Sequence, residues 1–552
     1  MFSKNNLFAM KNISMVLCIL LFLSCKDDRN ETANSKTDIS DISTKEFTEF
    51  KVEDSKFINV DELWEPFEEE LKSFSENEYE TIKPLIFEQT IPVIQENIAS
   101  GKLTYEALTK FYLFRIRKFD RNNNKSLNSV IALNSNVIQQ ARQADNQRLN
   151  SVSHPIYGMP ILLKDNINTS EMPTTAGAVA LLSNETDDAF IVKRLKEKGA
   201  IILGKTNLSE WAYFFCGDCP SGYSAVGGQT FNPYGRKTMD TGGSSSGSAV
   251  AVAANFCAAA IGSETSGSIL SPASQNSTVG LKPTIGLVSR SGIIPISSTL
   301  DTAGPITKSV IDNGIVLDAI MEFDKSDKKS IKPVEPNGEL FKKIHASKFM
   351  YGKRFAAFNR LKEDSLYVHA IDLLKSQGAD VIEIDEEDID LPEFLRLLNL
   401  DMKIDLPAYF KNYGNKELSV TSVKDVIDFN AKDSLKNAPY GQKLFKGIVE
   451  DSASKVDYAN IKTTLKSNGM AYFDRAFETY QLDGFLSINN YHAGFAAVAE
   501  YPAITVPMGY AKDGVPRGLT FIAKPLQEMQ LLEWAYAFEK ASKSRISPKN
   551  YN

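Results

Sequence analysis

The 552-residue sequence has few of the residues that build metal centres or disulfide frameworks, with five cysteines and four histidines. A structural zinc site takes four ligands, commonly from two Cys-x-x-Cys or His pairs. The sequence holds one such pair, Cys216 and Cys219, and no second. Five cysteines in a chain of this length are also too few for a fold that depends on disulfides. The composition therefore predicts no zinc site and a core built by burial of apolar residues.

The chain also lacks an excess of basic residues and long apolar stretches. Lys and Arg number 62 against 69 Asp and Glu, which gives a formal net charge of −7, and no block is dense in Lys or Arg. A dedicated nucleic-acid-binding protein needs a basic surface, so this class is excluded. The mean hydropathy of −0.22 excludes a protein with many membrane spans. With 43% hydrophobic and 24% charged residues, the composition is that of a globular protein.

One apolar run, near the N-terminus, calls for a membrane explanation. Lys4 and Lys11 precede an apolar stretch over residues 13–23, which ends at Ser24 and Cys25. The stretch is shorter than the roughly 20 residues of a spanning helix and is typical of a signal peptide. A small residue followed by Cys resembles the cleavage site of bacterial lipoproteins, which predicts a signal peptide over 1–24 and a lipid on Cys25. The alternative is an ordinary cleaved signal with an unmodified cysteine.

The next segment, residues 25–58, is rich in charged residues and poor in aliphatic ones. Such a segment cannot bury enough apolar surface to offset its ordering entropy, so we expect a disordered linker followed by a folded domain over 59–552. A lipid on Cys25 and this linker would hold the domain at a membrane of the bacterial cell envelope. In that oxidising location Cys216 and Cys219 form either a disulfide or two free thiols, and the sequence leaves both open.

Apolar runs alternate with helical patterns along the folded part, which favours an α/β fold around a mixed sheet. We expect one helix over 86–100, a second that begins after its cap Thr104, a third that ends at residue 149 and a fourth over 189–198. Strands are expected over 129–133, 160–163, 200–203 and 380–384. Residues 325–480 are more charged and mostly helical in pattern.

Two Gly/Ser-rich segments carry the chemistry of the chain. Residues 242–248 read Gly-Gly-Ser-Ser-Ser-Gly-Ser and lead into an Ala/Val run, which predicts a tight loop at a helix N-terminus. A phosphate-binding loop is excluded because it needs Lys where Ser248 stands. Residues 262–269 form a run of small residues in which several backbone N–H groups can converge on one oxyanion.

A serine nucleophile needs a base, and the four histidines lie outside any recognisable triad pattern. His492 alone lies in a loop that can line a pocket. Lys164 follows Ile161–Leu163 on an expected buried strand, where burial would lower its pKa and provide a neutral amine near pH 7. The alternative is a lysine that extends to the surface or pairs with Asp165.

Together these segments resemble the amidase signature family. The resemblance rests on Gly158–Asn166, Gly242–Ser248 and Gly262–Ile269, with Ser244 and Ser268 separated by the family's 24 positions, and it covers about residues 85–540. Further agreement lies in Gly204–Trp211, Gly227–Pro233, Gly280–Leu287 and Tyr501–Pro507. Residues 289–296 are similar to the peptide amidases. Ser266 and Leu270 depart from the common pattern, which affects the expected acyl pocket but removes no catalytic group.

The resemblance implies a single α/β/α domain with a central mixed sheet of about eleven strands and no metal, nucleotide or other cofactor. It implies that Ser268 is the nucleophile, that Ser244 transfers protons and that Lys164 is the base. The implied oxyanion hole consists of the backbone N–H groups of Thr265, Ser266, Gly267 and Ser268.

The resemblance further implies hydrolysis of a carboxamide C–N bond through an acyl-enzyme. We expect the C-terminal amide of a peptide as substrate and ammonia as product. The alternatives are hydrolysis of other linear, cyclic or aryl amides, a surface-tethered binding protein without activity, and a subunit of a transfer-RNA-dependent amidotransferase, whose cytoplasmic site conflicts with a signal peptide. Aromatic residues within 325–480 are expected to shape the pocket or to lie in the core: Tyr409, Phe410, Tyr413, Tyr440 and Phe445.

Overall fold

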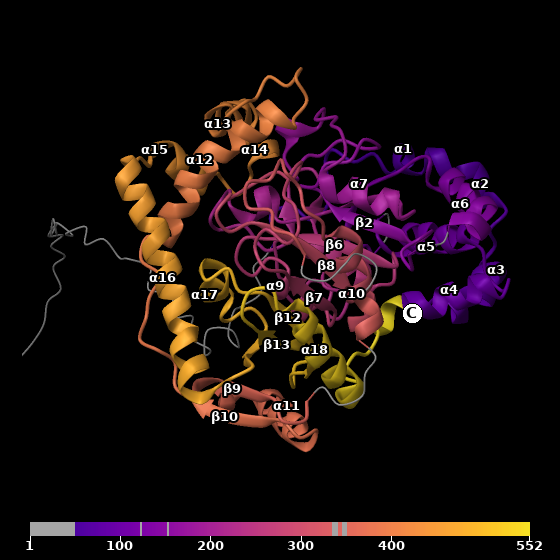
Figure 1. Ribbon diagram of the computed structural model, residues 1–552. Helices are drawn as coiled ribbons and strands as arrows, with labels where there is room; N and C mark the ends of the chain where they lie inside the picture. Colours follow the sequence, from indigo (N-terminus) through magenta and orange to yellow (C-terminus); the bar gives the residue numbers. More distant parts are fainter. Residues whose placement is uncertain (1–49, 122–123, 152–153, 334–339, 345–349) are drawn as a thin grey trace, which may run out of the picture. The chain divides into compact units, whose positions relative to one another are not determined.

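A large mixed sheet organises the protein (Figure 1). The computed structural model describes residues 50–121, 124–151, 154–333, 340–344 and 350–552. The sheet has eleven strands in the order β1-β3-β2-β6-β8-β7-β12-β13-β11-β9-β10, which confirms the expected fold class and strand number. Their bounds are β1 Val130–Leu133, β2 Pro160–Lys164, β3 Ile201–Thr206, β6 Ala259–Glu264, β7 Val279–Lys282, β8 Thr302–Thr307, β9 Arg354–Phe358, β10 Asp380–Ile384, β11 Gly484–Ile488, β12 Ala503–Tyr510 and β13 Pro516–Ile522. A separate hairpin consists of β4 Tyr223–Ser224 and β5 Gly228–Gln229.

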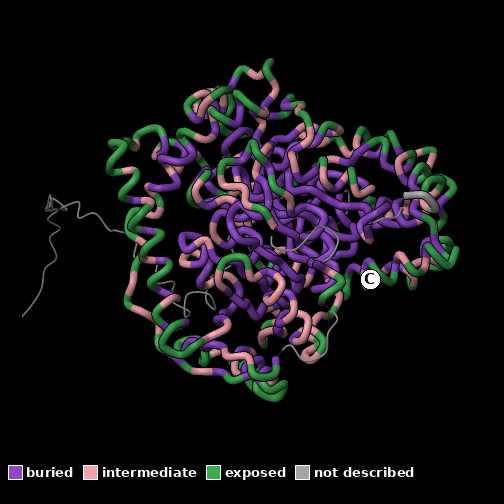
Figure 2. Tube along the Cα trace, in the orientation of Figure 1, coloured by how far each residue is buried: buried purple, intermediate pink, exposed green. Residues whose placement is uncertain are grey.

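The centre of the sheet is buried along its whole length. Every residue of β2, β3 and β6 is buried, as expected for strands covered by helices on both faces. β2 runs parallel to both β3 and β6, so the carboxyl ends of these three strands lie at the same edge. Figure 2 shows this buried centre surrounded by helices with exposed outer faces.

The helices follow the expected pattern with shifted ends. Their bounds are α1 Val60–Trp64, α2 Glu68–Lys72, α3 Glu76–Ile82, α4 Ile91–Ala99, α5 Tyr105–Phe119, α6 Val137–Ser151, α7 Phe190–Glu197, α8 Ser246–Ala253, α9 Leu270–Gln275, α10 Val310–Ile320, α11 Ser365–Ser376, α12 Phe394–Asn412, α13 Val423–Ala431, α14 Ser434–Asn437, α15 Lys443–Glu450, α16 Lys455–Tyr480, α17 Ala493–Val498 and α18 Glu528–Ser542. Thr104 caps α5, where its side chain accepts a hydrogen bond from Ala107 N. The helix expected from residue 86 begins at Ile91.

Residues 50–58, which we assigned to the linker, contact the folded domain. Asp54 forms a β-bridge with Gly228, and the carbonyl of Glu53 accepts a hydrogen bond of 2.7 Å from Gln229 N. Phe50 packs edge-on against Phe231 with ring centroids 5.6 Å apart. The expected start of the folded domain at residue 59 is therefore wrong, because backbone pairing with the β5 hairpin orders this polar segment. Cys25 and the signal peptide lie outside the described residues.

Residues 325–480 supply β9 and β10 of the sheet and the helices α11–α16. Figure 1 shows α12–α15 near one end of the long helix α16 and β9 near its other end. At that second end Arg354 Nε donates to Tyr480 O. α12 and α15 contribute Leu397, Tyr409 and Phe445 to a hydrophobic cluster shared with Trp211. Over the part of the chain that the structure describes, no helix combines the length and apolarity needed to cross a membrane.

Candidate active site

Lys164 lies at the carboxyl end of β2, fully buried, as the apolar run before it predicts. Its Nζ lies 2.7 Å from Ser244 Oγ and 3.0 Å from the carbonyl oxygen of Ser263. Ser263 belongs to β6, the parallel neighbour of β2. The sheet therefore brings together a lysine and a serine that are 80 positions apart.

The surroundings of Lys164 favour its neutral form. Burial lowers the pKa of the amine to about 7, against the opposing effect of the Asp301 and Glu264 carboxylates. An ordinary lysine has a pKa near 10.4 and carries no lone pair at neutral pH. The amine of Lys164 is thus available as a proton acceptor close to pH 7.

The carboxylate of Asp165, which follows Lys164 in the sequence, pairs with another lysine. Lys205 on β3 is also buried, and its Nζ lies 2.9 Å from Asp165 Oδ1 and 2.9 Å from Thr174 Oγ1. The alternative in which Lys164 pairs with Asp165 is therefore wrong, as is the alternative in which it reaches the surface. Asp165 and Lys205 form their own buried pair beside the site.

The loop that carries Ser244 is tied to the loop that carries Ser268. Ser245 N donates to Ser268 O at 3.1 Å, and Ser209 N donates to Ser244 O at 3.1 Å. The peptide bond between Gly243 and Ser244 is cis. α8 begins at Ser246, which confirms the expected loop at a helix N-terminus. Ser244 and Ser268 thus share one hydrogen-bonded loop pair at the sheet edge.

The carboxylate of Glu264 fixes the backbone of the Ser268 loop. Glu264, the last residue of β6, accepts hydrogen bonds through Oε2 from Ile269 N at 2.7 Å and Leu270 N at 3.0 Å. Residues 265–268 therefore close a turn between β6 and α9. The first three residues of the expected turn, 262–264, instead belong to the strand. The sequence pattern did not indicate this role of Glu264, although the residue stands inside the motif.

The turn leaves backbone donors available. Gly267 has φ +88°, and within the described residues the N–H groups of Ser266, Gly267 and Ser268 donate to no acceptor of the chain. Adjacent free donors of this kind are what an oxyanion hole requires. The Ser268 side chain, 9% exposed, makes no hydrogen bond to a described residue, whereas Ser244 and Lys164 are fully buried. Hydrogen bonds of a catalytic nucleophile commonly tighten when substrate binds.

His492, the alternative base, is engaged elsewhere. Its Nδ1 lies 2.6 Å from Ser487 Oγ, and its Nε2 lies 3.1 Å from Glu386 Oε1. The ring stacks on Phe358 at 4.2 Å between centroids, and burial lowers its pKa. Both ring nitrogens have partners, so neither is free to accept a proton from Ser268.

A cavity of about 300 Å³ adjoins the Ser268 loop. Ser263 and Thr265 line it next to the Ser268 loop, Ile293–Ile296 form an apolar wall, and Tyr409 and Tyr413 also line it. Of the aromatic residues of 325–480 that we expected to shape the pocket or to lie in the core, these two tyrosines line the cavity. Among the others, Phe410 and Phe445 lie in the hydrophobic cluster, and Tyr440 packs edge-on against Tyr223.

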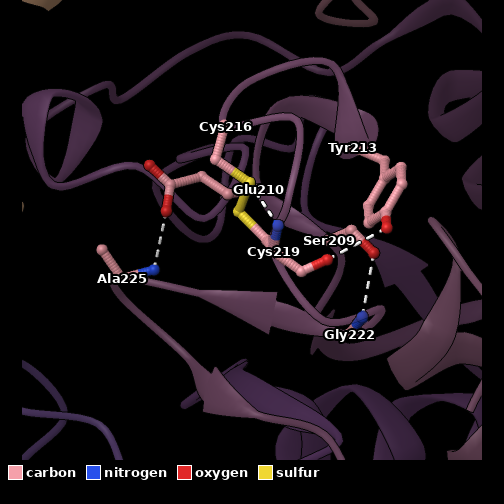
Figure 3. The surroundings of a disulfide bond; sticks show 7 residues. All are labelled: Ser209, Glu210, Tyr213, Cys216, Cys219, Gly222 and Ala225. Carbon is pink, nitrogen blue, oxygen red and sulfur yellow. Dashed lines mark hydrogen bonds between the residues drawn. A yellow bond between two sulfur atoms is a disulfide. The ribbon is translucent and has the colours of Figure 1, made fainter. Parts of the chain in front are cut away.

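The structure resolves the open question about Cys216 and Cys219 in favour of a disulfide, with Cα atoms 5.9 Å apart (Figure 3). The Tyr213 hydroxyl donates to Cys219 O at 3.0 Å, and Gly222 N donates to Ser209 Oγ at 2.9 Å. Ser209 is also the residue whose N–H contacts Ser244 O. Hydrogen bonds therefore link the chain around the disulfide to Ser209, which contacts Ser244.

The sequence pattern of the amidase family matches residues 107–483, a range that contains Lys164, Ser244 and Ser268. The chain belongs to the amidase family. A protein of Arabidopsis thaliana named as a probable amidase is 38% identical over 481 residues, which cover 84% of this chain and 92% of the relative. The resemblance to the amidase signature family is thereby confirmed.

Solved structures of amidases have the same fold. An amidase family protein from Bacillus anthracis superposes with a TM-score of 0.85 at 35% identity and covers 90% of this chain and all of its own. The native peptide amidase from Stenotrophomonas maltophilia superposes with a TM-score of 0.79 at 38% identity, covering 84% of this chain and 98% of that one. The single α/β domain around a sheet of eleven strands is thus the amidase fold.

Proposed function

We propose that this amidase hydrolyses the C-terminal carboxamide of short peptides through a Ser268–Ser244–Lys164 triad. The observation that carries the proposal is the 2.7 Å contact between Lys164 Nζ and Ser244 Oγ, made by a buried lysine whose pKa is lowered to about 7. The 38% identity to a solved peptide amidase supports the substrate class.

In the first step, Ser268 Oγ attacks the carbonyl carbon of the amide. The Ser268 proton passes to Ser244, which passes its own to the neutral Lys164 amine. The carbonyl oxygen becomes an oxyanion, which the N–H groups of Thr265, Ser266, Gly267 and Ser268 stabilise. Because these donors are fixed by the turn before substrate arrives, little reorganisation is needed.

The leaving group departs as ammonia after it receives the proton that Lys164 holds, returned through Ser244. The C–N bond breaks, and the acyl group remains as an ester on Ser268. A water molecule then attacks the ester carbonyl and gives its proton along the same path, which releases the carboxylic acid and restores the Ser268 hydroxyl.

The test is mass spectrometry of a short peptide amide after incubation with the enzyme. Replacement of –NH₂ by –OH raises the mass by about one unit, and the internal peptide bonds stay intact. We expect higher kcat/KM for this substrate than for acetamide or propionamide, because the cavity wall at Ile293–Ile296 and the two tyrosines offer apolar contacts to a larger acyl group. Cleavage within the chain, or a preference for acetamide, would overturn the proposal.

We also propose that the enzyme is anchored to a membrane of the bacterial cell envelope by a lipid on Cys25. The support is the apolar stretch over 13–23 that ends at Ser24 and Cys25, followed by a polar segment. An anchored hydrolase in that location would act on peptides and amides from outside the cell.

A further inference from the structure

The cavity beside the Ser268 loop contains a carboxylate without a cationic partner. Asp405 of α12 lines the cavity, and its Oδ2 accepts a hydrogen bond of 2.6 Å from Ser298 N. No ion pair to Asp405 is formed by any lysine, arginine or histidine of the described chain. Among the described residues, the hydrogen-bond donors to this carboxylate are the backbone and the side chain of Ser298, and a carboxylate can accept further bonds from a ligand.

Arg290 and Asp301, two other charged residues of the cavity wall, are engaged with neighbouring groups. Arg290 binds Asp327 through Nε at 2.8 Å and through a second nitrogen, and its Nη1 donates to Ser298 O at 2.6 Å. Asp301 accepts from Thr265 Oγ1 at 2.6 Å through one oxygen and from two backbone N–H groups through the other. Lys328 lies exposed on the lining. The lining holds the carboxylates of Glu264, Asp301, Asp327 and Asp405 against the two cations of Arg290 and Lys328. This excess of negative charge favours a cationic ligand group.

The state of Asp405 fits this role. Burial raises the pKa of its carboxyl to about 6, and the nearby Asp401 carboxylate raises it further, while Lys462 opposes the shift. The positive charge of Arg290 is held by Asp327. Above pH 6 the partly exposed Asp405 is ionised, so an ammonium group in the cavity would gain a charge-assisted hydrogen bond.

The distance between the nucleophile loop and Asp405 suits a short peptide. Thr265 contacts Asp301, Asp301 contacts Ser297 N at 2.9 Å, and Ser298 N contacts Asp405. One carboxyl group, one peptide unit and three hydrogen bonds laid end to end span roughly 13 Å, which is the upper limit for the separation of Thr265 and Asp405. An extended chain covers at most about 3.5 Å per residue, so a peptide of no more than about four residues is long enough to reach from one end to the other.

We propose that Asp405 binds the α-ammonium group of a di- to tetrapeptide amide whose terminal carbonyl lies at Ser268. This inference rests on the proposed peptide amidase function and adds that short peptide amides with a free amino terminus are the preferred substrates. A lysine side chain offers the same ammonium chemistry, so the test distinguishes the two sources.

The experiment compares three dipeptide amides that share the C-terminal residue: one with a free amino group, its N-acetylated form, and an N-acetylated form with lysine at the first position. We expect kcat/KM for the free amine to exceed that for the acetylated form by about tenfold or more. In Asp405→Asn this ratio should fall toward 1, mainly through KM. The control Asp428→Asn removes an exposed carboxylate of α13 and should keep the wild-type ratio.

The comparison of the three substrates on the wild-type protein tests the inference even if a variant folds poorly. A wild-type ratio near 1, or a ratio that Asp405→Asn leaves unchanged, would overturn it while the peptide amidase function stands. A rate for the acetylated lysine substrate equal to that of the free amine would assign the site to a side-chain ammonium and overturn the amino-terminal assignment. Failure to hydrolyse any peptide amide would instead overturn the proposed function itself.

Discussion

Gly267 faces Asn490 so closely that a β-carbon built on the glycine would lie 2.9 Å from the Asn490 amide nitrogen. The glycine also has φ +88°, a conformation that side chains rarely adopt. We predict that Gly267→Ala displaces the oxyanion donors and lowers kcat by about tenfold or more, with a smaller change in KM. Steady-state ammonia release measures both constants.

Gly101→Ala is the matched control, because Gly101 has φ +74° and a β-carbon added there would have no other atom within 4 Å. Both variants should lose about 1–2 kcal/mol of unfolding free energy from the strained backbone. Only Gly267→Ala should lose turnover. Equal kcat values in the two variants would show that the turn at Gly267 does not hold catalytic donors.

The triad predicts that Ser268→Ala and Lys164→Ala each lower kcat by at least ~10³-fold, because residues that act as a unit fail together. Ser244→Ala should retain slightly more activity, since a water molecule can partly replace the bridging hydroxyl. The measurement is ammonia release from a peptide amide under saturating conditions. Near-normal turnover in Lys164→Ala would require another base, although both ring nitrogens of His492 are occupied.

The lowered pKa of Lys164, about 7, predicts the acid side of the pH profile. The amine must be neutral to accept a proton, so kcat/KM should be highest above pH 7 and fall about tenfold per pH unit below it. An N-acetylated peptide amide is the suitable substrate, because it has no α-ammonium group whose binding would depend on the ionisation of Asp405. The fall of kcat/KM below pH 7 should persist in His369→Gln, which alters an exposed histidine of α11. A flat profile down to pH 5 would argue against Lys164 as the base.

The buried pair of Lys205 and Asp165 predicts a stability effect beside the site. Lys205→Met leaves the carboxylate buried without a cation and should lower the free energy of unfolding by about 3–5 kcal/mol. Urea denaturation measures the change. Lys424→Met breaks an exposed pair with Asp428 and should change stability by less than about 1 kcal/mol. Similar losses in both variants would mean that burial of the Lys205 pair has no special energetic role.

The proposed anchor predicts that labelled fatty acid is incorporated into the wild-type protein in a bacterial host and is lost in Cys25→Ala. Membrane fractionation of the same cells should move the variant to the soluble fraction. Incorporation that continues in Cys25→Ala would remove the lipoprotein proposal. Cys257→Ala is the control, because Cys257 is a buried thiol and carries no predicted lipid.

Features that depend on neighbouring residues could be predicted from the sequence. The run Ile161–Leu163 placed Lys164 on a buried strand, and the Ala/Val stretch after the Ser244 loop indicated a helix. The strand over 380–384 was expected and β10 has those bounds. In each case a local pattern of apolar residues fixes the burial of the segment.

Features that depend on distant segments could not be predicted. Asp301 supports the Ser268 loop through Thr265 from 36 positions away, and no local pattern marks that contact. The sequence could not tell which aromatic residues of 325–480 line the cavity and which lie in the core, because helical periodicity does not show which partner each helix face meets. Residues 50–58 have a polar composition that favours disorder, yet backbone pairing with Gly228 outweighs it.

The pairing of β7 with β12 has a consequence for how the enzyme matures during synthesis. β12 begins at Ala503, long after β7 ends at Lys282, and the helix that follows Ser268 is held to it by a hydrogen bond of 2.8 Å between Ser274 and Thr505. At about 5–20 residues per second, a ribosome needs roughly 10–40 s to supply that strand after β7 emerges. Until then β7 presents an unpaired edge, the kind of edge that associates with other chains. During this interval the nascent chain is therefore open to association through β7.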